Sequence, residues 1–142
     1  MTQRKLEDLP PDECYALLRT ARVGRLVYDD GAGPVAEPVN YAVAGTDIVF
    51  RIEGGAKREA VRQPNVAFEV DHVDDDMAGG WSVIARGTGR EVPLEEVSDL
   101  LRRIEGAPPV PWALGVHNVW LQLHPTTVSG RRLGAASMSA SA

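Results

Sequence analysis

Two turns near the beginning of the chain are too short to contain a helix, and each lies between stretches rich in β-branched and aromatic residues. The turns occupy residues 29–34 and 44–47, and the stretches that they join occupy residues 23–28, 35–43 and 47–52. Glycine, proline and aspartate in these turns are typical of hairpins. Two hairpins in succession predict antiparallel strands, and they argue against the alternation of strands and helices that builds a parallel sheet.

The remaining segments complete a fold that is predicted to be mainly β. Strand composition recurs at residues 66–72, 81–92 and 117–124. Helical spacing of apolar residues predicts a first helix, whose stripe is Cys14, Leu17, Leu18 and Ala21, and a second helix at 94–104. A short helical turn is predicted at 57–62. Six strands with so few helices predict a six-stranded antiparallel barrel with helices packed at its ends. Side chains fill the interior of a barrel of this size, so a ligand is expected outside it, in a groove between two subunits.

Length and charge narrow the class of protein. A chain of 142 residues suits one domain, expected at residues 1–133, with an Ala/Ser-rich tail at 134–142 that is expected to be disordered. The formal charge of −5 argues against nucleic acid as the main partner. The apolar runs are too short to cross a bilayer, and the N-terminus does not resemble a secretory signal. A single cysteine, Cys14, excludes an intrachain disulfide and a multi-cysteine metal site. Together these features predict a cytoplasmic protein without membrane partners.

A possible phosphate site follows the strand at residues 47–52. Phe50 and Arg51 end that strand, a turn with two glycines follows, and Lys57 lies where a helical turn is predicted to begin. Two cations beside the backbone N–H groups of a helix N-terminus form an anion site. An ordinary solvated loop with two cations has the same pattern, and the spacing alone favours neither interpretation.

Two further segments carry polar or aromatic groups that a ligand could use. Pro38, Val39, Asn40 and Tyr41 form one of them, in which the asparagine interrupts an apolar strand and needs a polar partner. Trp81 and Ser82 form the other, at the beginning of a strand, where the indole could flank a planar ring and the hydroxyl could meet a phosphate. Packing in the core and at the strand entry explains each of these segments more simply.

Other patterns give no support to a catalytic or metal site. Residues 31–36 match G-x-G-x-x-A formally, but they lead into Pro34 and a strand, whereas a dinucleotide fingerprint opens a helix. The histidines, His72, His117 and His124, have no metal-ligand spacing, and a solvated loop accounts best for the acidic residues near His72. Cys14 lies on an apolar helix stripe, as a core residue does.

Taken together, these segments resemble the pyridoxamine 5′-phosphate oxidase-like, FMN-binding split-barrel family, and in particular its small bacterial branch of nitroimidazole-resistance-type proteins. The resemblance extends from about Glu13 to Leu133. The order and spacing of the matching segments are together more specific than any single segment. The matching pieces lie at residues 13–18, 23–26, 38–41, 50–51, 55–57, 66–71, 80–83 with Gly87, 111–113 and 130–132.

The resemblance implies a homodimer of split barrels with two flavin sites at the subunit interface. It implies that Arg51 and Lys57 hold the FMN phosphate, next to Phe50, and that the strand from Pro38 to Tyr41 runs beside the ring. Trp81 and Ser82 would line the ribityl-phosphate end. Trp112 and the segment near Trp120 would close the site from the other subunit. Tyr41 would be a proton donor only if its side chain faced the ring.

Two departures from the family pattern affect the expected function. Relatives usually carry a hydroxyl residue where this chain has Ile52, and Thr or Ser where it has Ala56, and both hydroxyls could donate hydrogen bonds to phosphate. The expected function is that of an FMN-dependent oxidoreductase acting on an unknown small molecule. A deazaflavin-dependent reductase, a non-catalytic carrier of flavin or haem and a cofactor-free dimer remain as alternatives.

Overall fold

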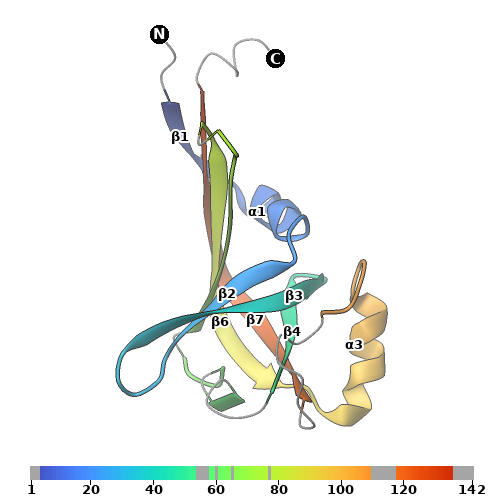
Figure 1. Ribbon diagram of the computed structural model, residues 1–142. Coiled ribbons are helices and arrows are strands. Elements are labelled where there is room, and N and C mark those ends of the chain that lie inside the picture. The colour runs from blue at the N-terminus through green and yellow to red at the C-terminus, as the bar shows by residue number, and fades with distance from the viewer. Residues whose placement is uncertain are drawn as a thin grey trace.

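Seven strands and two α-helices make up most of this computed structural model, which describes residues 4–53, 58–59, 61–64, 66–76, 78–109 and 118–135 (Figure 1). The strands are β1 (Arg4–Leu9), β2 (Val23–Asp29), β3 (Pro34–Ala44), β4 (Asp47–Glu53), β5 (Val66–Val73), β6 (Gly80–Glu91) and β7 (Asn118–Ala135). The helices are α1 (Pro11–Leu18), the 3-10 helix η1 (Leu94–Glu96) and α3 (Val97–Arg103). The fold is therefore mainly β, as predicted.

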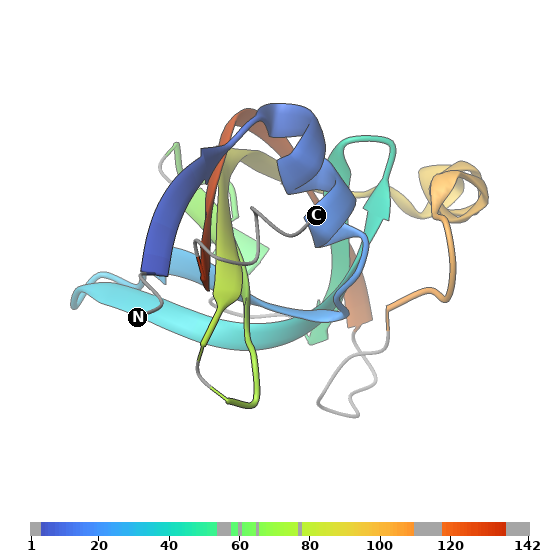
Figure 2. The same ribbon diagram turned by 90° about the horizontal axis from the view of Figure 1, so that it is seen from above.

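The sheet closes into a six-stranded antiparallel barrel in the order β7, β4, β3, β2, β5 and β6, with β6 pairing back onto β7 (Figure 2). β7 has 18 residues and borders three strands. It pairs with β4 from Asn118 to Leu123, with β6 from Leu121 to Leu133, and with β1 from Gly130 to Ala135. The seventh strand, β1, therefore adds to the barrel at the end of β7.

The predicted strands agree closely with the observed ones, and most differences lie at the ends of the chain. β1 was not predicted, and β7 continues past the predicted end at His124 and into the segment expected to be a disordered tail. The rest of that tail, residues 136–142, lies outside the described residues. The first helix ends at Leu18, before Ala21. Of the predicted turn at 57–62, Arg58 and Glu59 have helical backbone, while Lys57 and Ala60 are not described.

The main hydrophobic core fills the barrel because alternate residues of each strand point inward. Phe50, Phe68 and Leu26 are fully buried there, and α1 contributes Cys14 and Leu18 from its position across one end of the barrel (Figure 2). A larger residue than glycine at position 24 would force core side chains to shift, because a Cβ at that position would lie 2.2 Å from the ring of Phe68.

A second, smaller core lies outside the barrel wall and positions part of the candidate site. Leu100 of α3 is buried there with the outward-facing residues Ala42 and Val49, and Trp120 packs against the same cluster. The prediction that the helices pack at the ends of the barrel is thus correct for α1 and wrong for α3, which lies beside the wall (Figure 1). None of the helices in the described ranges is long and apolar enough to cross a membrane. The cytoplasmic location stays a prediction.

Candidate functional site

Strand alternation divides the predicted ring-lining segment of β3 between two sides of the barrel wall. Val39 and Tyr41 point inward, where they are 4% and 3% exposed. Pro38 is exposed and Asn40 half-buried, and both lie on the outer side of the strand. Only Pro38 and Asn40 can therefore present side chains to a ligand outside the barrel.

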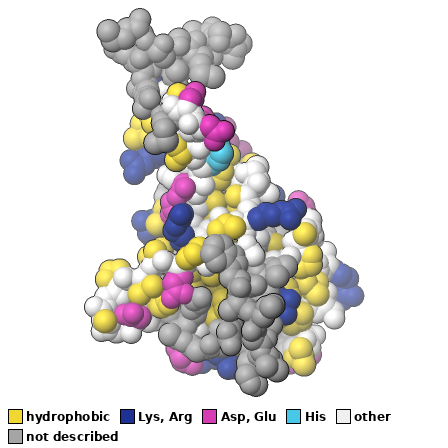
Figure 3. All heavy atoms as spheres, viewed as in Figure 1, with side chains coloured by type: hydrophobic (Ala, Val, Ile, Leu, Met, Phe, Trp, Pro, Cys, Tyr) yellow, Lys and Arg dark blue, Asp and Glu magenta, His cyan; other side chains and the backbone are white. Residues whose placement is uncertain are grey.

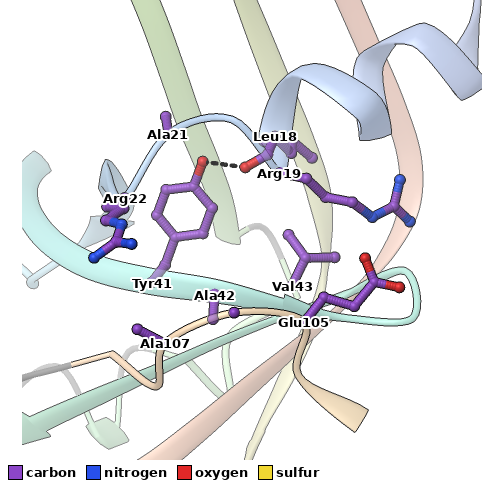
Figure 4. A pocket seen from close by; sticks show the side chains of 10 residues that line it. Leu18, Arg19, Ala21, Arg22, Tyr41, Ala42, Val43, Glu105 and Ala107 are labelled. Atoms are coloured by element: carbon purple, nitrogen blue, oxygen red, sulfur yellow. Dashed lines mark hydrogen bonds between the residues drawn. The ribbon is translucent and has the colours of Figure 1, made fainter.

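The side chain of Tyr41 is buried inside the barrel. Its hydroxyl donates a hydrogen bond of 2.5 Å to the carbonyl oxygen of Leu18 (Figure 4), and its ring packs edge-on against Phe68 with the centroids 5.0 Å apart. Burial raises the pKa of Tyr41. The hollow beside it, of about 110 Å³, has Arg19 and Arg22 on opposite sides of the tyrosine ring (Figure 4). Tyr41 therefore has a packing role and does not face the outer site.

Arg51 lies on the outer side of β4, between two inward-facing neighbours. Phe50 is fully buried and its ring centroid lies 5.7 Å from that of Phe68, while Ile52 is 3% exposed in the same core. The side chain at position 52 therefore faces the interior. For this reason the absence of a hydroxyl at Ile52 removes nothing from the face that carries Arg51. Ala56, the other departure from the family pattern, lies outside the described residues.

The guanidinium of Arg51 lies over an aromatic ring, and one of its donors has no hydrogen-bond partner in the described ranges. Arg51 and Trp120 are directly opposite each other in the β4–β7 ladder, and Cζ of Arg51 lies 5.1 Å from the centre of the indole ring. Its Nε is buried and has no hydrogen-bond partner among the residues that the structure describes. A buried donor on a cation is costly to leave unpaired, so this atom is suited to an anionic ligand. Lys57 and Trp112, also predicted for this site, are not among the described residues.

The β6 residues of the predicted site lie elsewhere on the barrel. Trp81 packs against the main core, with its ring centroid 6.5 Å from that of His72. Ser82 lies on the opposite side of β6, across from Asp71 of β5 and Arg131 of β7. Arg51 is opposite Trp120 of β7, whereas Ser82 is opposite Arg131, eleven positions further along the same strand. Within one chain, therefore, Ser82 and Arg51 are not brought together.

Two acidic residues of β5, Glu69 and Asp71, share one arginine, Arg25 of β2. These two strands lie between β3 and β6 in the sheet. Arg25 of β2 is opposite Pro38 on one side and opposite Glu69 on the other. Its NH1 lies 3.5 Å from Oε1 of Glu69 and 3.4 Å from Oδ2 of Asp71. Oε1 of Glu69 is buried and, beyond this ion pair, has no hydrogen-bond partner among the described residues. Burial, and after it the neighbouring Asp71, raise the pKa of Glu69 to about 7, against the opposing effect of Arg25.

A polar network on the outer side of β4 and β7 was also not anticipated. Asp47 accepts hydrogen bonds from Gln122 Nε2 at 2.6 Å and pairs with His124 Nδ1 at 2.7 Å. Arg90 donates to Gln122 Oε1 at 3.1 Å and pairs with Glu96. The network lines a hollow of about 270 Å³. Alternating polar residues on β7 were the available signal, but the register that joins them to Asp47 could not be read from the sequence.

The described residues contain no cluster of three or more His, Cys, Asp or Glu side chains that could hold a metal ion. His72 instead pairs with Asp74, with Nε2 and Oδ1 3.3 Å apart. On the face shown in Figure 3, basic and acidic side chains of the described ranges are interspersed. Among the described residues, the outer face of β2 to β5 thus carries the Arg51 guanidinium and the acidic pair with Arg25.

Comparisons with known proteins agree with this architecture. An uncharacterized protein of Mycobacterium tuberculosis, Rv0080, is 31% identical over 141 residues, covering 94% of this chain and 90% of that protein. The structure of the FAD binding protein from Mycobacterium smegmatis is 30% identical, with a TM-score of 0.72, and the match covers 89% of this chain and 98% of that one. A Bacteroides thetaiotaomicron structure assigned to 5-nitroimidazole antibiotic resistance has a TM-score of 0.72 at 15% identity, covering 95% and 92% of the two chains. That last likeness shows the fold alone.

The family model for pyridoxamine 5′-phosphate oxidase matches residues 10–132. This match includes β2 to β6, β7 as far as Arg132, and the Arg51–Trp120 pair. The resemblance noted in the sequence is thereby confirmed, and the chain belongs to the pyridoxamine 5′-phosphate oxidase family.

Proposed function

We propose that this protein binds a flavin, FMN, on the outer face of β3 and β4 and acts as an oxidoreductase. The observation that carries the proposal is the buried, unpaired Nε of Arg51 on the outer side of the wall. The FAD binding protein from Mycobacterium smegmatis, 30% identical to this chain, supports a flavin as the ligand class. FMN and FAD share the isoalloxazine ring, the ribityl chain and the phosphate attached to it, so one arginine can serve either.

The residues of this chain fit the phosphate end of such a ligand. Arg51 presents a planar set of N–H donors that suits phosphate oxygens, and Nε can take an acceptor without losing another bond. Pro38 and Asn40 lie on the same outer side, across the neighbouring strand, where the ring would run. In this proposal Lys57 adds a second cation to the phosphate.

A bound flavin supplies hydride or electron transfer to the site. The chain itself then has to anchor the phosphate, orient the ring and exclude water from one face. Tyr41 takes no part in proton movement, because its hydroxyl is bonded to the Leu18 carbonyl inside the barrel. Glu69 is a carboxyl group that can hold a proton near neutral pH on the same outer face.

The proposal includes a homodimer in which each site is shared. Arg51 and Asn40 lie on the neighbouring strands β4 and β3, whereas β2 and β5 separate β3 from β6, the strand of Ser82. A second copy is the simplest means of bringing a β6 segment, with Trp81 and Ser82, next to β3 and β4. Val23, directly opposite Asn40, is 45% exposed and would be covered by such a contact. Trp112 would also reach the site in this assembly.

A titration of the purified protein with FMN, followed by flavin fluorescence, tests the proposal. We expect saturable binding, and a loss of at least tenfold in affinity for Arg51→Ala, since charged hydrogen bonds to phosphate are lost. Arg51→Lys should lose less. The matched control is Arg103→Ala, which removes an exposed arginine at the end of α3 and should bind FMN as the parent does.

Parallel measurements separate the alternatives. Tighter binding of the deazaflavin coenzyme than of FMN would make the protein a deazaflavin-dependent reductase. Binding of haem alone would point to a carrier, and no binding of any of the three would identify a cofactor-free dimer. Reduction of the bound flavin by NADH or NADPH is expected of an oxidoreductase, and its failure with both, together with tight flavin binding, would favour a carrier.

A further inference from the structure

Trp120 is the nearest described aromatic partner of Arg51, and the two residues belong to the same chain. They are paired across the β4–β7 ladder, with the guanidinium carbon 5.1 Å from the centre of the indole ring. The resemblance had implied that the segment near Trp120 reaches the site from the other subunit. The observed contact places Trp120 beside Arg51 of its own chain.

Trp120 is supported by a backbone hydrogen bond and by packing against the outer core. The carbonyl oxygen of Trp120 accepts a hydrogen bond of 2.8 Å from the backbone N–H of Val92. Its half-buried ring packs against the outer core that α3 covers, in which Leu100 is 1% exposed and Val49 is fully buried. The ring is thus supported by a strand and a helix, and it offers a rigid platform to the longer and more flexible arginine.

Arg51 forms no salt bridge with any carboxylate in the described ranges, unlike Arg25, Arg58 and Arg90. An aromatic ring attracts a guanidinium through its face and leaves the N–H donors, which lie in the guanidinium plane, available for other partners. A carboxylate would occupy the same donors that a phosphate needs. Stacking on Trp120 therefore fixes the orientation of Arg51 while it keeps those donors available, and Nε remains without a partner.

We propose that Trp120 is a positioning residue that orients Arg51 toward the phosphate of the flavin, and that the pair thereby determines the preference for phosphorylated over unphosphorylated flavin. This inference rests on the proposed function and deepens it. Trp120 itself does not touch the phosphate. Its effect on binding passes through Arg51, and so it should depend on the phosphate being present.

The test compares FMN with riboflavin, which lacks the phosphate, in fluorescence titrations of the full chain. For Trp120→Met, which keeps an apolar side chain without a ring, we expect FMN affinity to fall about five- to thirtyfold, the range of a partly desolvated cation–π contact. Riboflavin affinity should stay within about twofold of the parent. Trp120→Phe, which restores an aromatic face, should recover most of the preference for FMN. In an Arg51→Ala background, Trp120→Met should have no further effect on FMN.

A control and a second variant keep the test decisive. Val97→Ala removes part of the same outer core and should lower thermal stability without changing the ratio of FMN to riboflavin affinity. Trp120→Leu replaces Trp120→Met if the latter does not fold. Equal loss of FMN and riboflavin affinity, or an additional FMN loss in the Arg51→Ala background, would overturn the positioning role.

Failure of the inference is distinguishable from failure of the proposed function. If the parent binds FMN and Arg51→Ala weakens it, but Trp120→Met binds FMN as tightly as the parent, only the positioning role is wrong. If the parent does not bind FMN, or if Arg51→Ala binds it unchanged, the phosphate site itself is wrong and the role of Trp120 is overturned with it.

Discussion

The carboxylate of Asp47 lies 2.6 Å from the side-chain nitrogen of Gln122, which is a hydrogen bond between the first residue of β4 and a residue of β7 that is only 6% exposed. Asp47 is itself largely shielded, with a side chain 16% exposed, and it also pairs with His124. A buried amide needs its partner, because an unsatisfied buried donor costs more than the hydrogen bond is worth on average.

Asp47→Ala should therefore lower the free energy of unfolding by about 1–3 kcal/mol, measured by urea denaturation. Asp47→Asn should cost less, because its amide oxygen can still accept from Gln122. The matched control is Asp99→Ala, which removes a highly exposed carboxylate that pairs only along α3 and should cost no more than about 0.5 kcal/mol. An equal effect of the two alanine substitutions would show that the network on β4 and β7 does not stabilise the barrel.

Glu69 makes the stability of the protein depend on pH in a defined direction. Its pKa in the folded protein, about 7, is above the ordinary value of 4.5, so between these values the folded state holds a proton that the unfolded state has released. Stability therefore falls as the pH rises from about 4.5 to about 7. Glu69→Gln removes this titration, and its stability advantage over the parent should grow across that range and level off above it, by about 1–3 kcal/mol in total.

Unfolding of the parent and of Glu69→Gln at several pH values between 4 and 8 checks this sign. Asp71→Asn is the companion variant. Removing the neighbouring negative charge should lower the pKa of Glu69, so the pH range over which stability falls should move to lower pH. Arg25→Ala should raise the pKa of Glu69 further and move that pH range upward, since the opposing cation is lost. A difference between parent and Glu69→Gln that does not vary with pH would contradict the raised pKa.

Gly24 is where a small substitution should have a large structural effect. A Cβ there would lie 2.2 Å from one ring atom of Phe68 and 2.9 Å from a methyl group of Val70, both in the centre of the barrel. Gly24→Ala should destabilise the protein by about 1–3 kcal/mol, because overpacking displaces core side chains. Gly134→Ala is the control, since a Cβ at that position of β7 has open space around it. Thermal denaturation of both variants gives the comparison.

Tyr41→Phe separates packing from flavin chemistry. The variant keeps the ring against Phe68 but leaves the carbonyl of Leu18 without its donor, so the free energy of unfolding should fall by about 1–2 kcal/mol. Because the hydroxyl lies inside the barrel, FMN affinity and the rate of flavin reduction should stay as in the parent. A large fall in the reduction rate with unchanged stability would instead place Tyr41 at the reacting ring.

The barrel could largely be predicted from the sequence because its signals are local. Hairpin turns and alternating apolar residues determined β2, β3 and β4 to within a residue or two of their observed ends. β1 was missed because its sequence is mostly charged and its pairing partner is the far end of β7. The second half of β7 was missed because its composition is not that of a buried strand. It begins with a proline, Pro125, and contains two glycines and several polar residues.

The candidate site was predicted less well, because its geometry depends on register between distant segments. The sequence drew attention to Arg51, but it could not show that Trp120 lies opposite that residue on β7. The direction of the side chain at Ile52 follows from simple alternation with Phe50 and Arg51, and applying that rule would have removed its supposed effect on phosphate binding. The raised pKa of Glu69 could not be predicted, because it depends on burial within the folded sheet, where β5 pairs with β2 over a long sequence separation.

The position of β7 also has a consequence for how the chain is made. It follows the other six described strands along the chain, yet β4 and β6 each depend on it for one of their two neighbours (Figure 1). β1 depends on it for the one strand with which it pairs. Until β7 emerges from the ribosome, the nascent chain has open strand edges and a half-formed interior, which are the features that favour association with other chains. The barrel can close only after β7 has been made, so protection of the growing chain must last until that strand is available for pairing.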